Sequence, residues 1–486
     1  MRQTRRGARG LWSVLLVLAG VSGLAGCGRE PLRVSVLIDD VVLIDGTDRG
    51  AVPGMSIAIS GDRIVAIRPT GGFEDDSVAV RVDGKGMYLI PGLWDMHTHQ
   101  GGYKEIGFPL YLANGVTTVR DVGTDPQQIG YWRQEVRAGR TLGPTILMAG
   151  PILDDPKVVE VAPSGRVGLS TAADAERVVD SLAALGVDII KVHSLLSREP
   201  YFATLRQARR HGLAVIGHVP DEVTAREAID SGQRTIEHTF GLAFENGAQA
   251  SAVRAAFQAE AAEIRATVES GREIVERVFA SKIAAIDSAI AVSDSAAAWE
   301  FAEYAARKDV WFDPTFVVAE NRYRPNDPSL RNLPEHRYLL GGRRPPSSPI
   351  DRAAGEAERA RWSRLLASFR PLVRAGAKFI AGTDVPVTPL VPGFSLHREL
   401  QVLVDLGMTP LEALQAATRN AAQAAGRPES GTVVEGNVAD LVLLRLDPLA
   451  DIGNTRTIET VVVRGQLLER SVLDRLLQTA ETAARQ

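Results

Sequence analysis

The feature that most constrains the fold is a regular alternation between residues 89 and 385, where short apolar runs are separated by longer segments of helical spacing. This alternation is typical of parallel α/β sheets, because each strand must return through a crossover helix. There are eight such runs, which read LIPGLWDMH, GVTTVRDVG, PTILMAGPIL, VDIIKVHS, LAVIGHVP, RTIEHTFG, VWFDPTFVV and AKFIAGTDV. Eight βα units predict an α/β fold of the closed (β/α)8 TIM-barrel type, with catalytic groups at the C-terminal ends of its strands.

The two ends of the chain share a different pattern. Residues 33–90 are rich in Val and Ile and are interrupted by short turns, and a similar pattern returns at 439–447 and 457–468. We therefore expect both ends to meet in one small β-sandwich that flanks the barrel. The predicted domains are residues 27–90 together with 429–470 for the β-sandwich, and residues 91–428 for the barrel.

Two segments interrupt the alternation of the barrel. Residues 243–308 are rich in Ala and Glu with helical spacing, and are far longer than a barrel connection requires. This helical insertion is equally compatible with a lid, an oligomer contact or padding. Residues 321–350 are rich in Pro and Arg, and we expect a long loop there.

Residues 1–26 have the features of a secretory signal, with a basic start, a short apolar core and small residues before Cys27. The stretch Leu24-Ala25-Gly26-Cys27 holds the only cysteine of the chain and resembles the bacterial lipoprotein box, which implies a lipid on Cys27. The alternative is an ordinary cleaved signal with an incidental cysteine. We expect an exported protein that contacts a bacterial membrane through its N-terminal lipid only.

Candidate metal ligands lie at the ends of the predicted strands. His97 and His99 alternate at the end of the first barrel strand, so both imidazoles face the same side. Two adjacent imidazoles supply half of a typical zinc site. Four further candidates follow strands four, five, six and eight, namely Lys191, His218, His238 and Asp384. Each has an ordinary explanation alone, such as a core histidine or a helix cap, but together their spacing favours one shared site.

With these residues in place, the chain resembles the amidohydrolase superfamily of metal-dependent barrel hydrolases. The resemblance covers roughly residues 33–470 and includes the closing stretches ALQAATRNAAQAAG and GTVVEGNVADLVLLRLDPL. It implies two divalent metal ions, with a lysine that bridges both after carboxylation by carbon dioxide. Neutral imidazoles suit zinc first, although manganese, cobalt and iron accept the same ligands. The implied ligands are His97, His99 and Asp384 for one metal, His218 and His238 for the other, and Lys191 as the bridging carbamate.

The stretch VDIIKVHSLLSREPYFATLRQARRHGLAVIGHVP resembles the imidazolonepropionase-like and Xaa-Pro dipeptidase-like (prolidase-like) branch. The bridging Lys191 favours its two-metal, prolidase-like members. These are expected to cleave the C–N bond of short peptides or N-acyl amino acids through a metal-bridging hydroxide. Asp384 would serve as the proton shuttle, first as base and then as acid.

Substrates of this kind carry a carboxylate, for which the sequence offers several partners beyond strands four and seven. The candidates are His193, Ser194, Tyr201, Arg322, Arg324, Arg343 and Arg344. The formal net charge of −4 shows no basic excess and argues against nucleic acid as a partner. Other amides, cyclic amides, lactones and esters stay open as substrates, as do deaminase or phosphotriesterase chemistry, a non-catalytic ligand-binding lipoprotein and a homo-oligomer.

Overall fold

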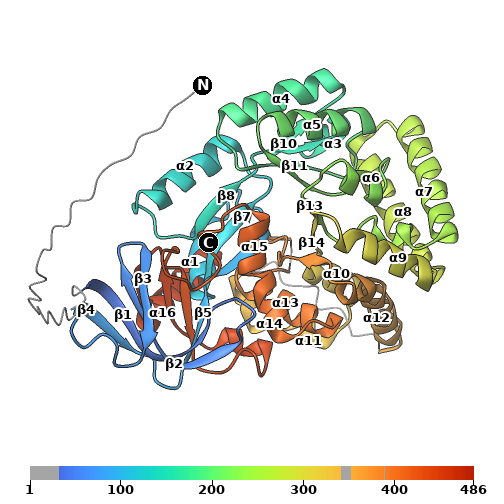
Figure 1. The fold of residues 1–486 in the computed structure, drawn as a ribbon. Helices are drawn as coiled ribbons and strands as arrows, with labels where there is room; N and C mark the ends of the chain where they lie inside the picture. Colours follow the sequence, from blue (N-terminus) through green and yellow to red (C-terminus); the bar gives the residue numbers. More distant parts are fainter. Residues whose placement is uncertain (1–31, 341–351, 388, 486) are drawn as a thin grey trace, which may run out of the picture.

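The computed structural model describes residues 32–340, 352–387 and 389–485. Cys27 with the predicted signal segment, and Arg343 with Arg344, lie outside the described residues. Within the described ranges, no helix combines the length and the apolar character that crossing a membrane requires. The described chain comprises parallel strands with their helices, a mixed sheet built from both chain ends, and a helical segment at one side (Figure 1).

Two parallel sheets lie at the centre of the molecule (Figure 1). The smaller sheet consists, in order, of β6 (Leu93–Thr98), β7 (Val116–Asp121) and β8 (Thr145–Met148). The larger sheet has the order β10-β9-β11-β12-β13-β14-β15. Its strands are β9 (Ile152–Asp154), β10 (Arg166–Gly168), β11 (Ile189–Val192), β12 (Ala214–Gly217), β13 (Thr235–Glu237), β14 (Trp311–Asp313) and β15 (Lys378–Phe379). The predicted α/β class with parallel strands is confirmed.

Every predicted apolar run overlaps at least one of these strands. The run at 144–153 is divided into β8 and β9 because Gly150, at φ 71°, turns the chain between them. Backbone hydrogen bonds also connect the two sheets: Met96 N–H donates to Ala381 O (3.0 Å), and Asp384 N–H donates to His97 O (2.7 Å). The end of β6 and the segment after β15 therefore lie side by side, although they are far apart in sequence.

The helices that connect the parallel strands lie outside them (Figure 1). Several begin where the sequence supplies a cap, as at Thr171 and Thr224, which form capping boxes with the side chains of Asp174 and Glu227. The helices of this layer are α1 (Lys104–Ala113), α2 (Pro126–Arg137), α3 (Pro156–Val161), α4 (Ala172–Ala184), α5 (Arg198–Arg210), α6 (Ala225–Asp230), α10 (Phe316–Tyr323), α12 (Arg352–Arg374), α13 (Phe394–Leu406), α14 (Pro410–Ala416) and α15 (Arg419–Ala424).

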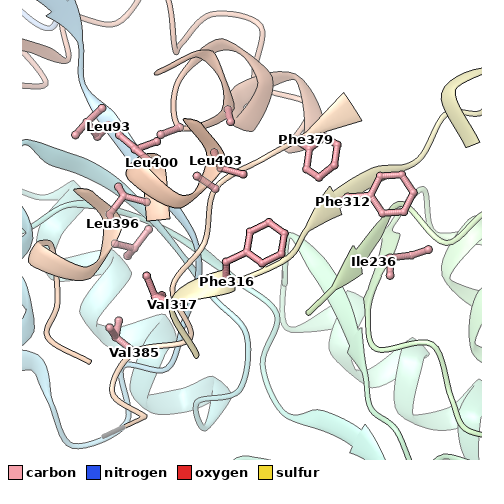
Figure 2. Close-up of a cluster of buried hydrophobic side chains, with 14 of the residues drawn as sticks. Leu93, Ile236, Phe312, Phe316, Val317, Phe379, Val385, Leu396, Leu400 and Leu403 are labelled. Atoms are coloured by element: carbon pink, nitrogen blue, oxygen red, sulfur yellow. The ribbon is translucent and has the colours of Figure 1, made fainter. Parts of the chain in front are cut away.

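The main hydrophobic core fills the space between the parallel strands and these helices. Leu396 and Leu400 are four residues apart and therefore share one face of α13, which is directed at Phe316 at the start of α10 (Figure 2). Phe312 on β14 and Phe379 on β15 continue this cluster, with ring centroids 5.7 Å apart. This core fixes the positions of the strand ends that carry the predicted ligands.

Strands from both chain ends form one eight-stranded sheet at the lower left of Figure 1. The two ends pair directly, since Leu89 lies opposite Leu443 in an antiparallel register. The sheet consists of β1 (Arg33–Ile44), β2 (Ala51–Ser60), β3 (Arg63–Pro69), β4 (Ser77–Asp83), β5 (Tyr88–Pro91), β16 (Leu441–Leu444), β17 (Ile458–Val463) and β18 (Gln466–Glu469). A last helix, α16 (Arg470–Ala484), then packs against α1.

Residues 243–308 are largely helical. After the short 3-10 helix η1 (Leu242–Glu245), the segment forms α7 (Ala248–Thr267), α8 (Gly271–Ala291) and α9 (Ser295–Ala306). Helices α7 and α8 share an apolar cluster of their own, which includes Phe257, Ile274 and Val278. The segment lies at the outer edge of the molecule, in yellow-green at the right of Figure 1.

The segment 321–350 was expected to be a loop, and its described part differs from that expectation. It contains α11 (Pro328–Arg331) and the 3-10 helix η2 (Pro334–Tyr338). Helix α11 forms because Asp327 accepts a hydrogen bond from Ser329 N–H (2.9 Å), while Pro328 fixes the backbone of the first helical residue. Pro328 and Pro334 thus start helical turns rather than prevent them.

Candidate metal centre and active site

One cavity, of about 240 Å³, collects side chains from the C-terminal ends of five parallel strands. All six residues predicted as metal ligands line it, namely His97, His99, Lys191, His218, His238 and Asp384. His97 belongs to β6 and Lys191 to β11, whereas His218, His238 and Asp384 follow the ends of β12, β13 and β15. The structure therefore brings together residues from five predicted strands.

Three of these donors converge most closely. His97 and His99 lie on alternate positions of one extended segment, with ring centroids 5.5 Å apart. The Oδ1 atom of Asp384 lies 3.0 Å from His99 Nε2 and 3.5 Å from His97 Nε2. One ligand atom from each residue falls within 4.8 Å of the other two, which is close enough to hold a metal ion.

A second pair of imidazoles lies beside the first. The ring centroids of His218 and His238 are 4.5 Å apart, and that of His238 lies 4.7 Å from His97. The residue before His218 must be glycine: Gly217 has φ 130°, and a Cβ atom there would lie 2.1 Å from Val192 O. Close approach of β12 to β11 thus sets the position of His218 next to Lys191.

Each of three imidazoles has its Nδ1 atom engaged by a neighbour. His97 Nδ1 lies 2.7 Å from Glu237 Oε2, and its N–H donates to that carboxylate. His218 Nδ1 lies 2.6 Å from Ser194 Oγ. His238 Nδ1 lies 2.6 Å from the Thr315 hydroxyl. These contacts leave Nε2 as the ring nitrogen available to a metal, the arrangement usual for metal-binding histidines.

The same histidines are in the protonation state that metal binding needs. Burial, followed by the positive charge of Lys191, lowers the pKa of His97 to about 4. Burial likewise holds the pKa of His218 and that of His238 well below the ordinary value. The imidazoles are therefore neutral near pH 7 and have a free lone pair.

Lys191 lies among these ligands with almost no exposure to solvent (1%). Its Nζ atom is 3.3 Å from His97 Nε2. Burial lowers the pKa of Lys191 to about 8, because removal from water disfavours the ammonium form. The unprotonated, nucleophilic amine is therefore a minor form near neutral pH, but a much larger one than for an exposed lysine.

Backbone strain is concentrated at the cavity. Among the described residues, five non-glycine positions have positive φ, and three of them are His238 (65°), Thr315 (44°) and Asp384 (63°). Such left-handed conformations cost energy for residues other than glycine and are characteristic of functional sites. The residue before Asp384 is fixed by hydrogen bonds, because Asp95 accepts from Thr383 N–H (3.1 Å) and from the Thr383 hydroxyl (2.6 Å).

Beneath the histidines lies a buried charge network that the sequence interpretation missed. Arg120 on β7 is 2% exposed and donates to Glu237 Oε1 (2.9 Å) and to Asp313 Oδ2 (3.1 Å). Burial opposes ionisation of both acids. Arg120 and His97 nevertheless hold the pKa of Glu237 well below its ordinary value, whereas burial and the charge of Glu237 raise that of Asp313. Glu237 is therefore the ionised partner and Asp313 the protonated one.

The charge of Asp384 follows from its neighbours. Burial alone would raise its pKa, but the adjacent His97 and the hydrogen bond with His99 outweigh that effect and lower the pKa well below the ordinary range. Asp384 is thus an anion that faces the cavity. It can ligate a cation and can accept a proton only when its surroundings change.

The predicted substrate contacts are placed in different ways. His193 lines the cavity, with Nδ1 2.8 Å from Asp154 Oδ2, and Arg322 lines it from α10. Tyr201 does not, which corrects the expectation that it faces substrate. It is completely buried on α5, where its hydroxyl donates to Gln233 Oε1 (2.7 Å).

The remaining candidates for substrate binding, beyond strands four and seven, are not part of the cavity lining where the structure describes them. Ser194 contacts His218 rather than the open cavity. Arg324 forms ion pairs with Glu320 and Asp327 outside the cavity lining. Arg343 lies outside the described residues, so its assignment stays a prediction.

Parallel strands that end in a cluster of imidazoles and one partly buried carboxylate define an α/β protein with a candidate metal centre. The chain belongs to the amidohydrolase family, whose sequence profile matches residues 88–468. This match confirms the predicted family and, with it, the predicted hydrolase class.

Two curated relatives share short stretches with the chain. Ochratoxinase from Aspergillus niger is 40% identical over 101 residues, which are 19% of this chain and 20% of that protein. N-acyl-D-aspartate deacylase from Alcaligenes xylosoxydans xylosoxydans is 36% identical over 92 residues, 18% of each chain. The chain thus matches about a fifth of the length of these relatives.

Solved structures are similar over most of the chain. A putative prolidase from Bifidobacterium longum has a TM-score of 0.62 at 22% identity and covers 92% of this chain and 100% of its own. Bottromycin amidohydrolase has a TM-score of 0.69 at 24% identity, with 92% and 90% covered. A Xaa-Pro dipeptidase with methionine in its active site has a TM-score of 0.59 at 19% identity, with 89% and 99% covered. At these identities, the similarity establishes a common fold.

Proposed function

We propose that this protein is a binuclear metal-dependent hydrolase that cleaves a C–N bond in short peptides or N-acyl amino acids. The observation that carries the proposal is the convergence of four histidines, one lysine and one aspartate in a single cavity. The family match and the prolidase-like fold support the same reaction class.

We infer that the two parallel sheets are parts of one closed (β/α)8 barrel, in which residues 91–428 form the catalytic domain. Support comes from the backbone hydrogen bonds between β6 and the segment after β15, and from the bond of Asp188 N–H to Met148 O (2.9 Å) at the other junction. Residues 27–90 and 429–470 would form the flanking β-sandwich. Their direct strand pairing supports a shared domain.

The donor set fits two divalent cations. His97, His99 and Asp384 would hold the first ion, and His218 with His238 the second. The buried, neutral rings of His97, His218 and His238, whose Nδ1 atoms are engaged, support this assignment. When bound, such ions supply Lewis acidity that polarises a carbonyl group and lowers the pKa of water. Zinc fits best, and manganese, cobalt or iron suit the same donors.

Lys191 would join the two metal positions as a carbamate formed with carbon dioxide. As an ammonium group it has only hydrogen-bond donors and cannot ligate a cation, whereas a carbamate has two anionic oxygens. Its burial beside His97, which favours the unprotonated amine, supports the modification. Carbon-13 NMR of protein equilibrated with labelled bicarbonate should show a carbamate signal that disappears in Lys191→Met.

Asp384 would move the proton of the reaction. Its carboxylate lies within 3.5 Å of both His97 Nε2 and His99 Nε2 and faces the cavity, so it can accept a proton from the attacking water and pass it to the leaving nitrogen. Asp384→Asn keeps the shape and one ligating oxygen. We expect near-normal metal content with a rate lowered at least about 100-fold.

The proposed substrate class is supported by similar proteins, which include a putative prolidase, a Xaa-Pro dipeptidase and an N-acyl-D-aspartate deacylase. The decisive test is a panel of dipeptides, N-acyl amino acids, lactones and aryl esters, assayed on the full-length chain with zinc or manganese. Release of amines from the first two groups is the expected result. Hydrolysis of esters alone, or no hydrolysis with two metals bound, would overturn the proposal.

We also propose that Cys27 carries a lipid that anchors the protein to a bacterial membrane on the exported side. The predicted signal segment before Cys27 supports this location. Cys27→Ser should move the protein from the membrane fraction to the soluble fraction. Unchanged fractionation of that variant would contradict the anchor.

A further inference from the structure

The helical insertion forms part of the cavity wall. Phe279 of α8 lines the cavity together with Phe240, which follows β13, and their ring centroids are 5.9 Å apart. A buried ion pair between Lys282 of α8 and Asp221, which follows β12, fastens the insertion to the strand that positions His218. The ion pair therefore fixes α8, and with it Phe279, against the cavity wall.

These two aromatic rings hold a guanidinium group. Arg322 lines the cavity from α10, with its Cζ atom 4.8 Å from the centroid of Phe279 and 5.8 Å from that of Phe240. Cation–π contacts at these distances orient the side chain. A planar guanidinium oriented by contacts with two rings can bind a carboxylate through two parallel hydrogen bonds.

The charge of Arg322 is compensated at a distance by Asp384, which lines the same cavity. Within the described part of the chain, no carboxylate forms an ion pair with Arg322. Arg166, the other arginine on the cavity wall, donates to Asp154 at 2.8 Å. Burial also lowers the pKa of Arg322, which indicates that its charge is incompletely solvated. A partly buried cation without an ion-pair partner is incompletely compensated, and an anionic ligand would relieve this cost.

We propose that Arg322 binds the carboxylate of the substrate while Phe240 and Phe279 pack against an apolar group next to it. The substrate class is then small N-acyl amino acids or dipeptides with a free carboxylate and an apolar side chain. This inference rests on the proposed function for the cleavage step, but the recognition it describes is independent of turnover. The cavity of about 240 Å³ is close to the lower end of ligand-pocket volumes, roughly 300 Å³, and so restricts the size of the substrate.

Kinetics with a matched pair of substrates test the role of the carboxylate. N-acetyl-L-phenylalanine and N-acetyl-L-phenylalaninamide differ only in that group, and deacetylation of each is followed by the amine released. For Arg322→Met, kcat/KM should fall at least about 30-fold with the acid and less than about 3-fold with the amide. The control Arg324→Gln removes a positive charge two residues away, outside the cavity lining, and should leave the ratio of the two substrates unchanged.

A binding measurement separates failure of this inference from failure of the proposed function. 3-Phenylpropionate has no C–N bond and is titrated calorimetrically into the full-length wild type and Arg322→Met, with 3-phenylpropan-1-ol as the uncharged probe. Loss of at least about tenfold in affinity for the acid alone is expected in the variant. If the wild type binds the acid in this way but cleaves nothing, the proposed reaction is wrong and the recognition site stands. If Arg322→Met binds the acid as tightly as the wild type, or loses activity equally on both substrates, the inference is overturned.

Discussion

Replacing Arg120 with Met should be among the most damaging single changes in this protein. The side chain is 2% exposed and lies between two buried carboxyl groups, at 2.9 Å from Glu237 and 3.1 Å from Asp313. Its Nε atom also donates to the backbone oxygen of Met96 in β6. Met fills a similar volume but removes the charge and these donors, so the ionised Glu237 would lose its cationic partner without access to water.

Removing one partner of a buried ion pair typically costs about 3–5 kcal/mol, because the remaining charge is left uncompensated. We expect a loss in this range in the free energy of unfolding of Arg120→Met, measured by urea denaturation of the full-length chain. Arg140→Met is the control: Arg140 forms an exposed pair with Glu135, and such pairs contribute about 0–1 kcal/mol.

The reasoning can be tested further by removing the acids as well. In Arg120→Met combined with Glu237→Gln and Asp313→Asn, no unpaired charge remains, so more than half of the lost stability should return. A loss below about 1 kcal/mol in Arg120→Met, or no recovery in the triple variant, would show that the network does not hold these charges as described.

Three further changes test the packing and electrostatics. Gly382→Ala would place a Cβ atom 2.6 Å from both carboxylate oxygens of Asp313 and 2.7 Å from His97 Cβ. Because the site must shift, bound metal per chain, measured by elemental mass spectrometry, should fall at least about twofold. The control Gly355→Ala, whose nearest contact would be at 3.5 Å, should keep its metal. Phe316→Ala removes a fully buried ring that lies 5.2 Å from Phe369, and urea unfolding should show a loss of about 3–5 kcal/mol. Burial raises the pKa of Asp440 to about 6 from 3.8, so its contribution to stability is complete below pH 3.8 and is lost as the pH rises through 6, an effect of about 3 kcal/mol. Asp440→Asn keeps an oxygen for Arg464 N–H and should remove this pH dependence, so that urea unfolding of wild type and variant diverges between pH 4 and 7; parallel pH profiles would contradict it.

The positions of the predicted ligands could be read from sequence because each follows from a local rule. Alternation in an extended strand places His97 and His99 on one side, and the ends of apolar runs place His218 and His238 at the same edge. The structure gathers them in one cavity. That they bind metal stays a prediction, since the rule concerns only where the side chains lie.

The buried network could not be read in the same way. Arg120 and Asp313 stand inside apolar runs, and this was the signal available, because a charge within a buried strand requires a partner. The sequence does not name that partner, since the contacts join strands that are distant in the chain. The prediction that Tyr201 contacts substrate was wrong because it relied on closeness in sequence to Lys191. Helix α5 directs the Tyr201 side chain into the core, where it contacts Gln233.

The sequence left the role of residues 243–308 open. The positions of Phe279 and Lys282 reduce the number of possible roles. Phe279 lines the cavity, so the insertion is not padding, and the Lys282–Asp221 pair ties α8 to the loop after β12. A lid that opens would have to break this buried pair, which is costly when neither charge finds a new partner. A fixed wall agrees better with these contacts than a moving lid does, because Phe279 then keeps its place in the cavity lining.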